Sequence, residues 1–201
     1  GYGALTSNTA AEDCVAVGRG ALRQGTSGTN NTAVGAFALD LTTGANNTAV
    51  GQQAGRYTTS GGSNTSIGQA ALTNCSSGAN NTGLGRQSLT ALTTGTQNTA
   101  LGMVSGSSVT TGNNNLLLGY QAGQGASPSG NITTQSNSVC LGNNNITGLF
   151  CADTSISSSD ARDKTDVTSF NIGLDWIKAL RPVTYRWDRR TWYGTDEETF
   201  G

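Results

Sequence analysis

Apolar and polar residues alternate in one short phrase that returns along most of this chain and always ends in glycine. Its versions read CVAVG, NTAVG, NTAVG, NTSIG, NTGLG, NTALG, NLLLG and SVCLG, and they end at Gly18, Gly35, Gly51, Gly68, Gly85, Gly102, Gly119 and Gly142. Counted from Gly1, the steps between these glycines are 17, 17, 16, 17, 17, 17, 17 and 23 residues. A fixed period of this size predicts similar units that stack along one axis and share a continuous core.

Each phrase carries a period-two pattern at its end. The residue before the glycine is always a large aliphatic, and the residue two places earlier is β-branched in all versions except NLLLG. Alternation of this kind predicts a short strand with one buried face. We therefore expect the aliphatic residue before the glycine to form a buried core column, which consists of Val34, Val50, Ile67, Leu84, Leu101, Leu118 and Leu141.

The remainder of each unit contains small residues and a second glycine column. Three residues after each motif glycine from Gly1 to Gly119 the side chain is Ala or Ser. Seven residues before the motif glycine stand Gly28, Gly44, Gly61, Gly78, Gly95 and Gly112, in contexts such as SGTNN and TGANN. Because Gly and Asn tolerate the positive φ of tight turns, each coil is predicted to contain a strand, a small-residue corner, a second short strand and a Gly/Asn turn.

These phrases resemble the head repeats of trimeric autotransporter adhesins, and also the repeats upstream of the processing domain in many phage tail fibres. The likeness covers Gly1 to about Gly142. It implies left-handed parallel β-roll (β-helix) repeats in a homotrimeric shaft, a mainly β fold, over residues 1–142. A thin coil of 17 residues cannot bury its own apolar surface, so assembly with further copies of the chain is also expected on physical grounds.

Charge and composition exclude several classes of function. Residues 1–155 carry eight charged side chains and the last 46 residues carry fifteen, with a net charge of −1. No basic stripe suits nucleic acid, no apolar run suits a membrane span, and no signal peptide is visible. The chain has no histidine and its four cysteines match no zinc spacing, so we expect no metal and no cofactor. The cysteines are interpreted as free structural thiols, with interchain disulfides as the alternative.

One unit is six residues longer than the others. The extra residues lie in the stretch GQGASPSGNITTQSNS, which includes Pro128. The favoured interpretation is a surface loop that bulges from one coil, and the alternative is a receptor-contacting loop, since long loops on rigid scaffolds often bind partners.

The pattern changes after Gly142. Residues 143–158 have no repeat and are expected to form a short stalk. Then comes Ser159-Asp160-Ala161-Arg162-Asp163-Lys164, followed by an apolar spacing that predicts a helix ending before Pro182, and by the alternating apolar residues of a strand. All three tryptophans lie in this tail, which is consistent with the start of a globular α+β core.

Residues 159–201 closely resemble the start of the intramolecular chaperone auto-processing domain that ends phage endosialidases and many tail spikes, and that recurs in the myelin regulatory factor family. The shared pattern is Ser-Asp-x-Arg-x-Lys, a helix, and then L-R-P-V-x-Y-x-W, which stands here as LRPVTYRW. The resemblance implies a domain that trimerises, templates folding of the upstream fibre and cuts itself off. Ser159 would be the nucleophile and Lys164 its base, with scission between Ser159 and Asp160, and with Asp160 and Arg162 in supporting roles.

This chemistry is reasonable for these residue types. A serine hydroxyl needs a neighbouring base, and lysine can act as one when burial or nearby charge lowers its pKa. The alternative is that Ser159 and Asp160 only cap a helix whose first turn contains Asp163 and Lys164.

The sequence therefore predicts a structural homotrimeric shaft of a viral tail fibre or spike, located in the virion and attached to a host surface glycan or protein receptor. A bacterial extracellular adhesin or surface fibre is the alternative. A polysaccharide depolymerase is disfavoured because residues 14–152 contain a single carboxylate, Asp40, where glycosidases need two. An ice-binding threonine array is disfavoured further, because each coil offers one threonine beside bulky asparagine. Any enzymatic activity is limited to the self-cleavage.

Overall fold

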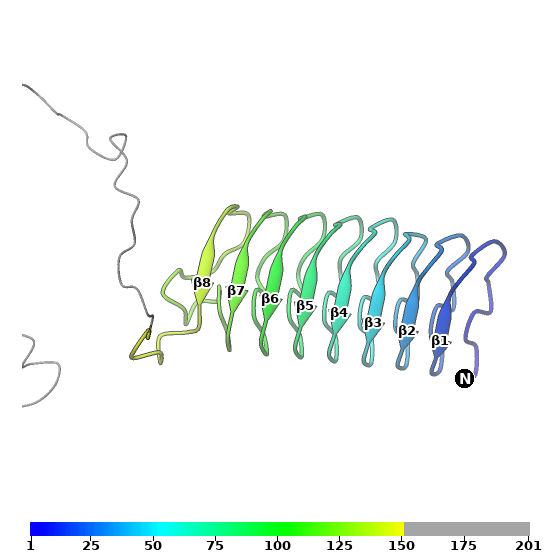
Figure 1. Cartoon of the computed structure of the whole chain (residues 1–201), viewed down its shortest axis with the longest axis horizontal. Helices are drawn as coiled ribbons and strands as arrows, with labels where there is room; N and C mark the ends of the chain where they lie inside the picture. Colours follow the sequence, from blue (N-terminus) through cyan, green and yellow to red (C-terminus); the bar gives the residue numbers. More distant parts are fainter. Residues whose placement is uncertain (151–201) are drawn as a thin grey trace, which may run out of the picture. The chain divides into compact units, whose positions relative to one another are not determined.

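The computed structural model describes residues 1–150, and these form a single parallel β-solenoid (Figure 1). Each coil contributes one strand of three residues, and the strands pair in sequence order as one eight-stranded sheet. The strands are β1 (Val15–Val17), β2 (Thr32–Val34), β3 (Thr48–Val50), β4 (Thr65–Ile67), β5 (Thr82–Leu84), β6 (Thr99–Leu101), β7 (Leu116–Leu118) and β8 (Val139–Leu141). No helix occurs between residues 1 and 150.

The sequence repeat sets the register of the sheet. Each strand residue pairs with its repeat equivalent in the next coil, as in Thr32↔Thr48, Ala33↔Ala49 and Val34↔Val50. The register is kept across the 23-residue step, where Leu117 pairs with Cys140. The mainly β, parallel, repeat architecture predicted from the glycine period is thus confirmed.

The predicted second strand is absent from every coil of residues 1–150. After the motif glycine the backbone alternates in the sign of φ, for example with φ of 58° at Phe37 and 46° at Leu39. Such a segment curls back toward the interior and cannot take the pleat of a strand. It still bonds from coil to coil, since the Leu22 N–H donates to Ala38 O at 3.0 Å and the Leu39 N–H to Ala54 O at 3.0 Å.

The core is built from leucines of this curled segment and small residues at the strand centres. Leu22, Leu39, Leu72 and Leu89 are at most 2% exposed, and they face strand centres such as Ala33, Ala49 and Ala100, which are fully buried. In the later coils the sizes are exchanged: Gly106 and Gly123 replace the leucine, and Leu117 occupies the centre of β7. A Cβ on Gly106 would lie 2.6 Å from Leu117 Cδ1, so the exchange keeps the core filled without overpacking.

The predicted core column faces outward in the single chain, which corrects the interpretation of the buried face. Val50, Leu84, Leu101 and Leu141 are 38%, 41%, 46% and 43% exposed, whereas the residue between the two outward positions of each strand points inward. The interior of a coil is already filled by the leucines, so only a small residue fits at most strand centres. Burial of the column between chains remains a prediction.

The second glycine column has a different cause from the one expected. Gly44 and Gly61 do not have positive φ; instead, a Cβ on either would overlap the carbonyl oxygen of the equivalent glycine in the next coil. These glycines therefore permit close stacking of the backbones. The motif glycines are the ones with positive φ, for example 138° at Gly35.

Candidate functional site

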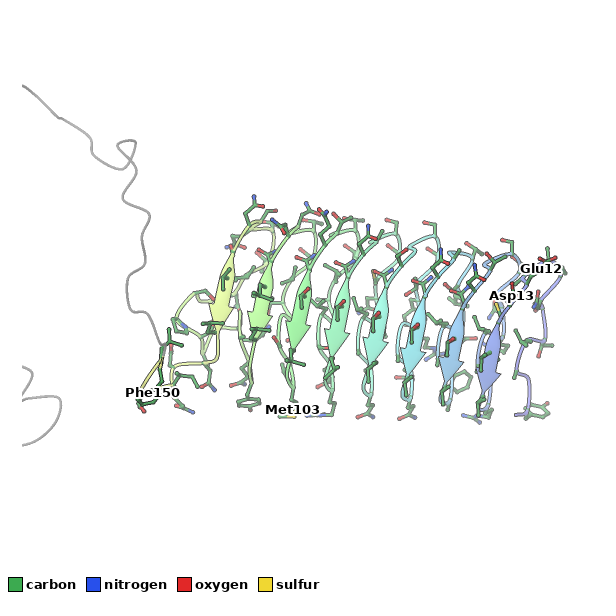
Figure 2. The ribbon with its side chains drawn as sticks, in the orientation of Figure 1. Glu12, Asp13, Met103 and Phe150 are labelled. Atoms are coloured by element: carbon green, nitrogen blue, oxygen red, sulfur yellow. The ribbon has the colours of Figure 1, made fainter. Side chains whose placement is uncertain are left out.

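The outward face of the sheet is a continuous strip of uncharged side chains. Each strand presents its first and third residues there: mostly Thr in the first column, and Val, Ile or Leu in the second. Because the register is unbroken, equivalent side chains lie side by side along the whole ladder, which Figure 2 shows as rows of sticks on the arrows. The strip contains the most exposed aliphatic side chains of the strands, including Val17 at 55% and Val139 at 68%.

The strip changes character at its last two strands. In β7 and β8 the threonine of the first column is replaced by Leu116 and Val139, so both outward columns are aliphatic there, as they are in β1 with Val15. These two residues, with Thr99 and the amides of Gln97 and Asn114, line an open pocket of about 240 Å³. The outward face therefore has two adjacent strands with both columns aliphatic at the end of the solenoid nearest residue 150, and one such strand, β1, at the other end.

A column of buried asparagines, the asparagine ladder, connects successive coils by hydrogen bonds along one edge of the sheet. The asparagine that directly precedes the strand is at most 2% exposed in six successive coils, and the ladder consists of Asn31, Asn47, Asn64, Asn81, Asn98 and Asn115. The Asn81 amide donates to Gly95 O at 2.9 Å, and its Oδ1 accepts the backbone N–H of Asn98 at 2.9 Å. The same two bonds recur along the ladder, so each amide satisfies two backbone groups of the following coil.

Sequence reasoning interpreted these asparagines only as turn residues and missed the ladder. A signal was present in the repeat. The residue before each ladder asparagine varies, with Ser63 and Gln97 beside asparagines, and it has positive φ and lies outward. The ladder position stays asparagine in six successive units, as expected of a residue whose side chain must bond in two directions. Figure 2 labels Glu12 and Asp13 at this edge of the first coil, opposite the edge that holds Met103.

The six-residue insertion lies between Gly123 and Ile132. Ile132 occupies the same place as Val109 in the preceding coil, because its N–H donates to Gly123 O at 2.9 Å as that of Val109 donates to Gly106 O at 3.0 Å. The inserted segment bulges as predicted, with Pro128 and Ser129 exposed, yet Ser127 is only 4% exposed. Its hydroxyl donates to Gln124 O at 2.7 Å, which closes the loop on itself.

The described cysteines are free thiols, namely Cys14, Cys75 and Cys140, and Cys151 lies outside the described residues. Burial raises the pKa of the Cys75 thiol from 9.0 to about 11, and a hydrogen bond with the backbone of Gly78 acts in the opposite direction. Burial also acts to raise the pKa of Cys140, but hydrogen bonds from the Ser129 hydroxyl and the Gly123 N–H outweigh it and the net shift is downward.

The residues predicted to carry the self-cleavage, Ser159, Asp160, Arg162 and Lys164, lie outside the described residues, as do the predicted stalk from residue 151 onward and the chaperone segment. Within residues 1–150 no group of three or more His, Cys, Asp or Glu side chains could hold a metal ion. That same part of the chain contains no helix long and apolar enough to cross a membrane.

Comparison with known proteins gives one match. Residues 159–201 match the model of the family described as "Chaperone of endosialidase" (Peptidase_S74). No curated protein and no solved structure matches the chain. A β-solenoid followed by a segment similar to this chaperone supports a tail-spike-like protein. The match begins at Ser159, the residue at which the sequence motif begins.

Proposed function

We propose that this chain is the shaft of a homotrimeric viral tail fibre or spike that attaches the virion to its host, with a C-terminal chaperone segment that templates trimer folding and cuts at Ser159. The observation that carries the proposal is the outward strand face. It is free of charged residues, aliphatic in every coil and in register along the ladder, and it is followed in sequence by residues similar to the endosialidase chaperone.

A second and third copy of the same chain are the occupants that best fit this face. Exposed, contiguous apolar strips on soluble proteins mark interaction surfaces. Two copies related by an axis parallel to the solenoid would present strips of the same repeat, so every Leu or Val of one chain would meet its equivalents in the others. Closed symmetry of this kind avoids the open-ended assembly that an unpaired flat sheet face would favour.

Light scattering coupled to size exclusion tests the assembly at micromolar concentration. We expect a mass three times that of the 20.4 kDa chain. Leu84→Gln combined with Leu101→Gln should weaken the trimer at least tenfold, because both side chains lie on the strip and are 41% and 46% exposed in the single chain. Met103→Gln is the matched control: Met103 is 40% exposed but follows β6 and lies off the strip, at the edge labelled in Figure 2, so it should leave the mass unchanged.

A monomer that retains its β-sheet circular dichroism at that concentration would contradict the proposal. So would equal dissociation by the Leu84/Leu101 pair and by Met103→Gln, since that would place the interface elsewhere.

A further inference from the structure

The solenoid is nearly uncharged, yet three of its four basic side chains gather in one place. Residues 1–150 contain Arg19, Arg23, Arg56 and Arg86, with no lysine. The guanidinium carbons of the first three lie 4.7, 5.5 and 5.0 Å from the centre of the Phe37 ring. Arg19 and Arg23 lie on the curled segment that follows β1, and Arg56 lies on the one that follows β3. Phe37 lies between them, on the segment that follows β2, and none of the four is on the outward strand face.

Phe37 and Asp40 hold this cluster in a fixed arrangement. A Cβ on Gly20 would lie 2.8 Å from the Phe37 ring, so the glycine lets the ring lie directly on the backbone of the neighbouring coil. Asp40 is 1% exposed and accepts two bonds from Arg23, at 2.9 Å to Nε and 3.1 Å to Nη2. The paired fork and the aromatic stack orient the guanidinium groups before any ligand arrives.

The cluster has more donors than its own acceptors can use. Arg56 Nε lies 3.5 Å from Asp40 Oδ2 but makes no hydrogen bond, although it is buried. The Arg19 side chain is exposed and has no carboxylate partner among residues 1–150. One carboxylate against three guanidinium groups leaves two positive charges, and each guanidinium carries five N–H donors.

Tyr57 adds an aromatic surface beside the same cluster. Its ring centre lies 5.0 Å from the guanidinium carbon of Arg56, and the residue is 38% exposed. Guanidinium forks match the planar geometry of carboxylates and bind sulfates equally by paired N–H donors. The face of an aromatic ring carries partial negative charge, which attracts the C–H groups of a sugar ring.

We propose that Arg19, Arg56 and Tyr57, held by Phe37, form a binding site for the anionic groups of an acidic polysaccharide, carboxylate or sulfate. The patch covers only three coils and no basic residue continues it along the ladder until Arg86, so it fits a short anionic segment and lacks the extended basic track that a nucleic acid needs. The site gives the proposed attachment function a ligand class and rests on that function for its biological role; three copies in a trimer would add avidity.

Arg86 provides a matched control within the repeat. It follows motif glycine Gly85 as Arg19 follows Gly18, and it is also exposed, but no aromatic ring or carboxylate of residues 1–150 contacts it. Arg19→Gln and Arg86→Gln therefore remove the same charge from the same position of the coil. Arg19→Lys keeps the charge but removes the fork, and Phe37→Leu keeps all charges but removes the ring that orders them.

The test is isothermal titration of the whole chain and these variants with polygalacturonate, dextran sulfate and neutral dextran. We expect one or both acidic polymers to bind and neutral dextran not to bind. Arg19→Gln should raise the Kd for the acidic polymers at least tenfold, and Phe37→Leu should raise it several-fold. The Kd of Arg19→Lys should lie between those of wild type and Arg19→Gln. The Kd of Arg86→Gln should stay within twofold of wild type. Thermal unfolding of each variant checks that the fold is kept, and light scattering of the same samples reports the trimer separately.

Equal weakening by Arg19→Gln and Arg86→Gln would overturn the site, because it would show attraction to net charge alone. Binding of both acidic polymers no tighter than that of neutral dextran would also overturn it, even where the trimer persists. Single-stranded DNA that binds as tightly as the acidic polymers, and weakens equally on Arg19→Gln, would overturn the assignment to polysaccharide.

Discussion

At the scale of single residues, the buried asparagine shows why one polar side chain can be kept in a thin core. Asn81 lies between two neighbours of its own kind, and its amide accepts from and donates to backbone groups that would otherwise lack partners. A buried polar group without partners costs about 1–3 kcal/mol. Removal of one asparagine would leave several backbone groups without hydrogen-bond partners at once. The hydrogen bonds of the ladder therefore tie coil to coil where no strand pairing exists.

Asn81→Ser should lower the free energy of unfolding by about 2 kcal/mol, because serine lacks the amide N–H that reaches Gly95 O. Asn80→Ser is the control. Asn80 is exposed with a φ of 60°, and Ser63 already occupies the equivalent place with a φ of 58°, so we expect a change under 0.5 kcal/mol. Urea unfolding followed by circular dichroism measures both, and equal losses would show that the ladder contributes nothing particular.

The raised pKa of Cys75 predicts that the stability of the fold depends on pH. Its thiol stays protonated in the folded chain up to about pH 11, whereas in the unfolded chain it ionises near 9.0. The contribution of this thiol to stability is complete below pH 9 and falls as the pH rises toward 11, by about 3 kcal/mol at most.

Urea midpoints at pH 8, 9.5 and 11 for wild type and Cys75→Ala measure this effect. Cys75→Ala should be less stable at pH 8, since it leaves a cavity, but its midpoint should decline less steeply with pH. Parallel curves for the two proteins would assign the alkaline loss to other groups.

At the scale of the coil, the sequence predicted the stacking but not the direction of the side chains. The glycine period specifies which residues pair, because each residue meets its repeat equivalent. The period-two pattern of each strand shows that two faces differ, yet it does not say which face is inside. Val50 was expected inside and lies outside, because Leu39 and Leu72 from the neighbouring curled segments already fill the space.

The curled segment itself could not have been predicted from propensity. Phe37, Leu39 and Leu72 have positive φ, which bulky side chains rarely adopt. The cost is met by the ladder of hydrogen bonds between coils and by burial of the leucines, and neither is visible before the coils are stacked. The processing residues, by contrast, were assigned through the resemblance of their motif and the LRPVTYRW stretch to a known domain. Residues 159–201 match that family's model, and the roles of the individual residues stay a prediction.

Close stacking predicts a large difference between two glycine substitutions. Gly61→Ala should destabilise the fold by more than 3 kcal/mol, because its Cβ would overlap the carbonyl oxygen of Gly78 and the backbone of a packed coil has little room to move. Gly125→Ala should stay within 1 kcal/mol of wild type, because the nearest atom to its Cβ is a side-chain atom of Asn131 at 3.7 Å. Any change should be stabilising, since alanine lowers the entropy of the unfolded chain. Thermal unfolding of both variants measures the difference, and a mild effect of Gly61→Ala would mean that the coils can separate there.

At the scale of the whole molecule, the two outward columns and the tail suggest an order of events. Both outward columns are aliphatic in two adjacent strands at one end of the sheet, β7 and β8, where Leu116 and Val139 replace threonine, but in the single strand β1 at the other end. This is the end of the solenoid that precedes the chaperone-like residues 159–201 in sequence. Pairing of chains that begins there can extend coil by coil toward Gly1, because each added coil needs contacts only with its neighbours.

Release of the chaperone would then make the assembled shaft kinetically stable. If Ser159 is the nucleophile and Lys164 accepts its proton, the natural protein should cut itself beside Ser159 after the chains have assembled. Ser159→Ala and Lys164→Ala should each leave uncut, still trimeric protein, because they remove the chemistry and leave the solenoid of residues 1–150 untouched. Asp160→Asn and Arg162→Gln, which change supporting residues, should slow the cut without abolishing it.

A denaturing gel of heated and unheated samples, with the mass of the shaft fragment, measures both cleavage and resistance to dissociation. Equal cleavage in wild type and Ser159→Ala would show that Ser159 only caps a helix, and the assignment of the nucleophile would fall while the trimeric shaft, tested separately by its mass, would stand.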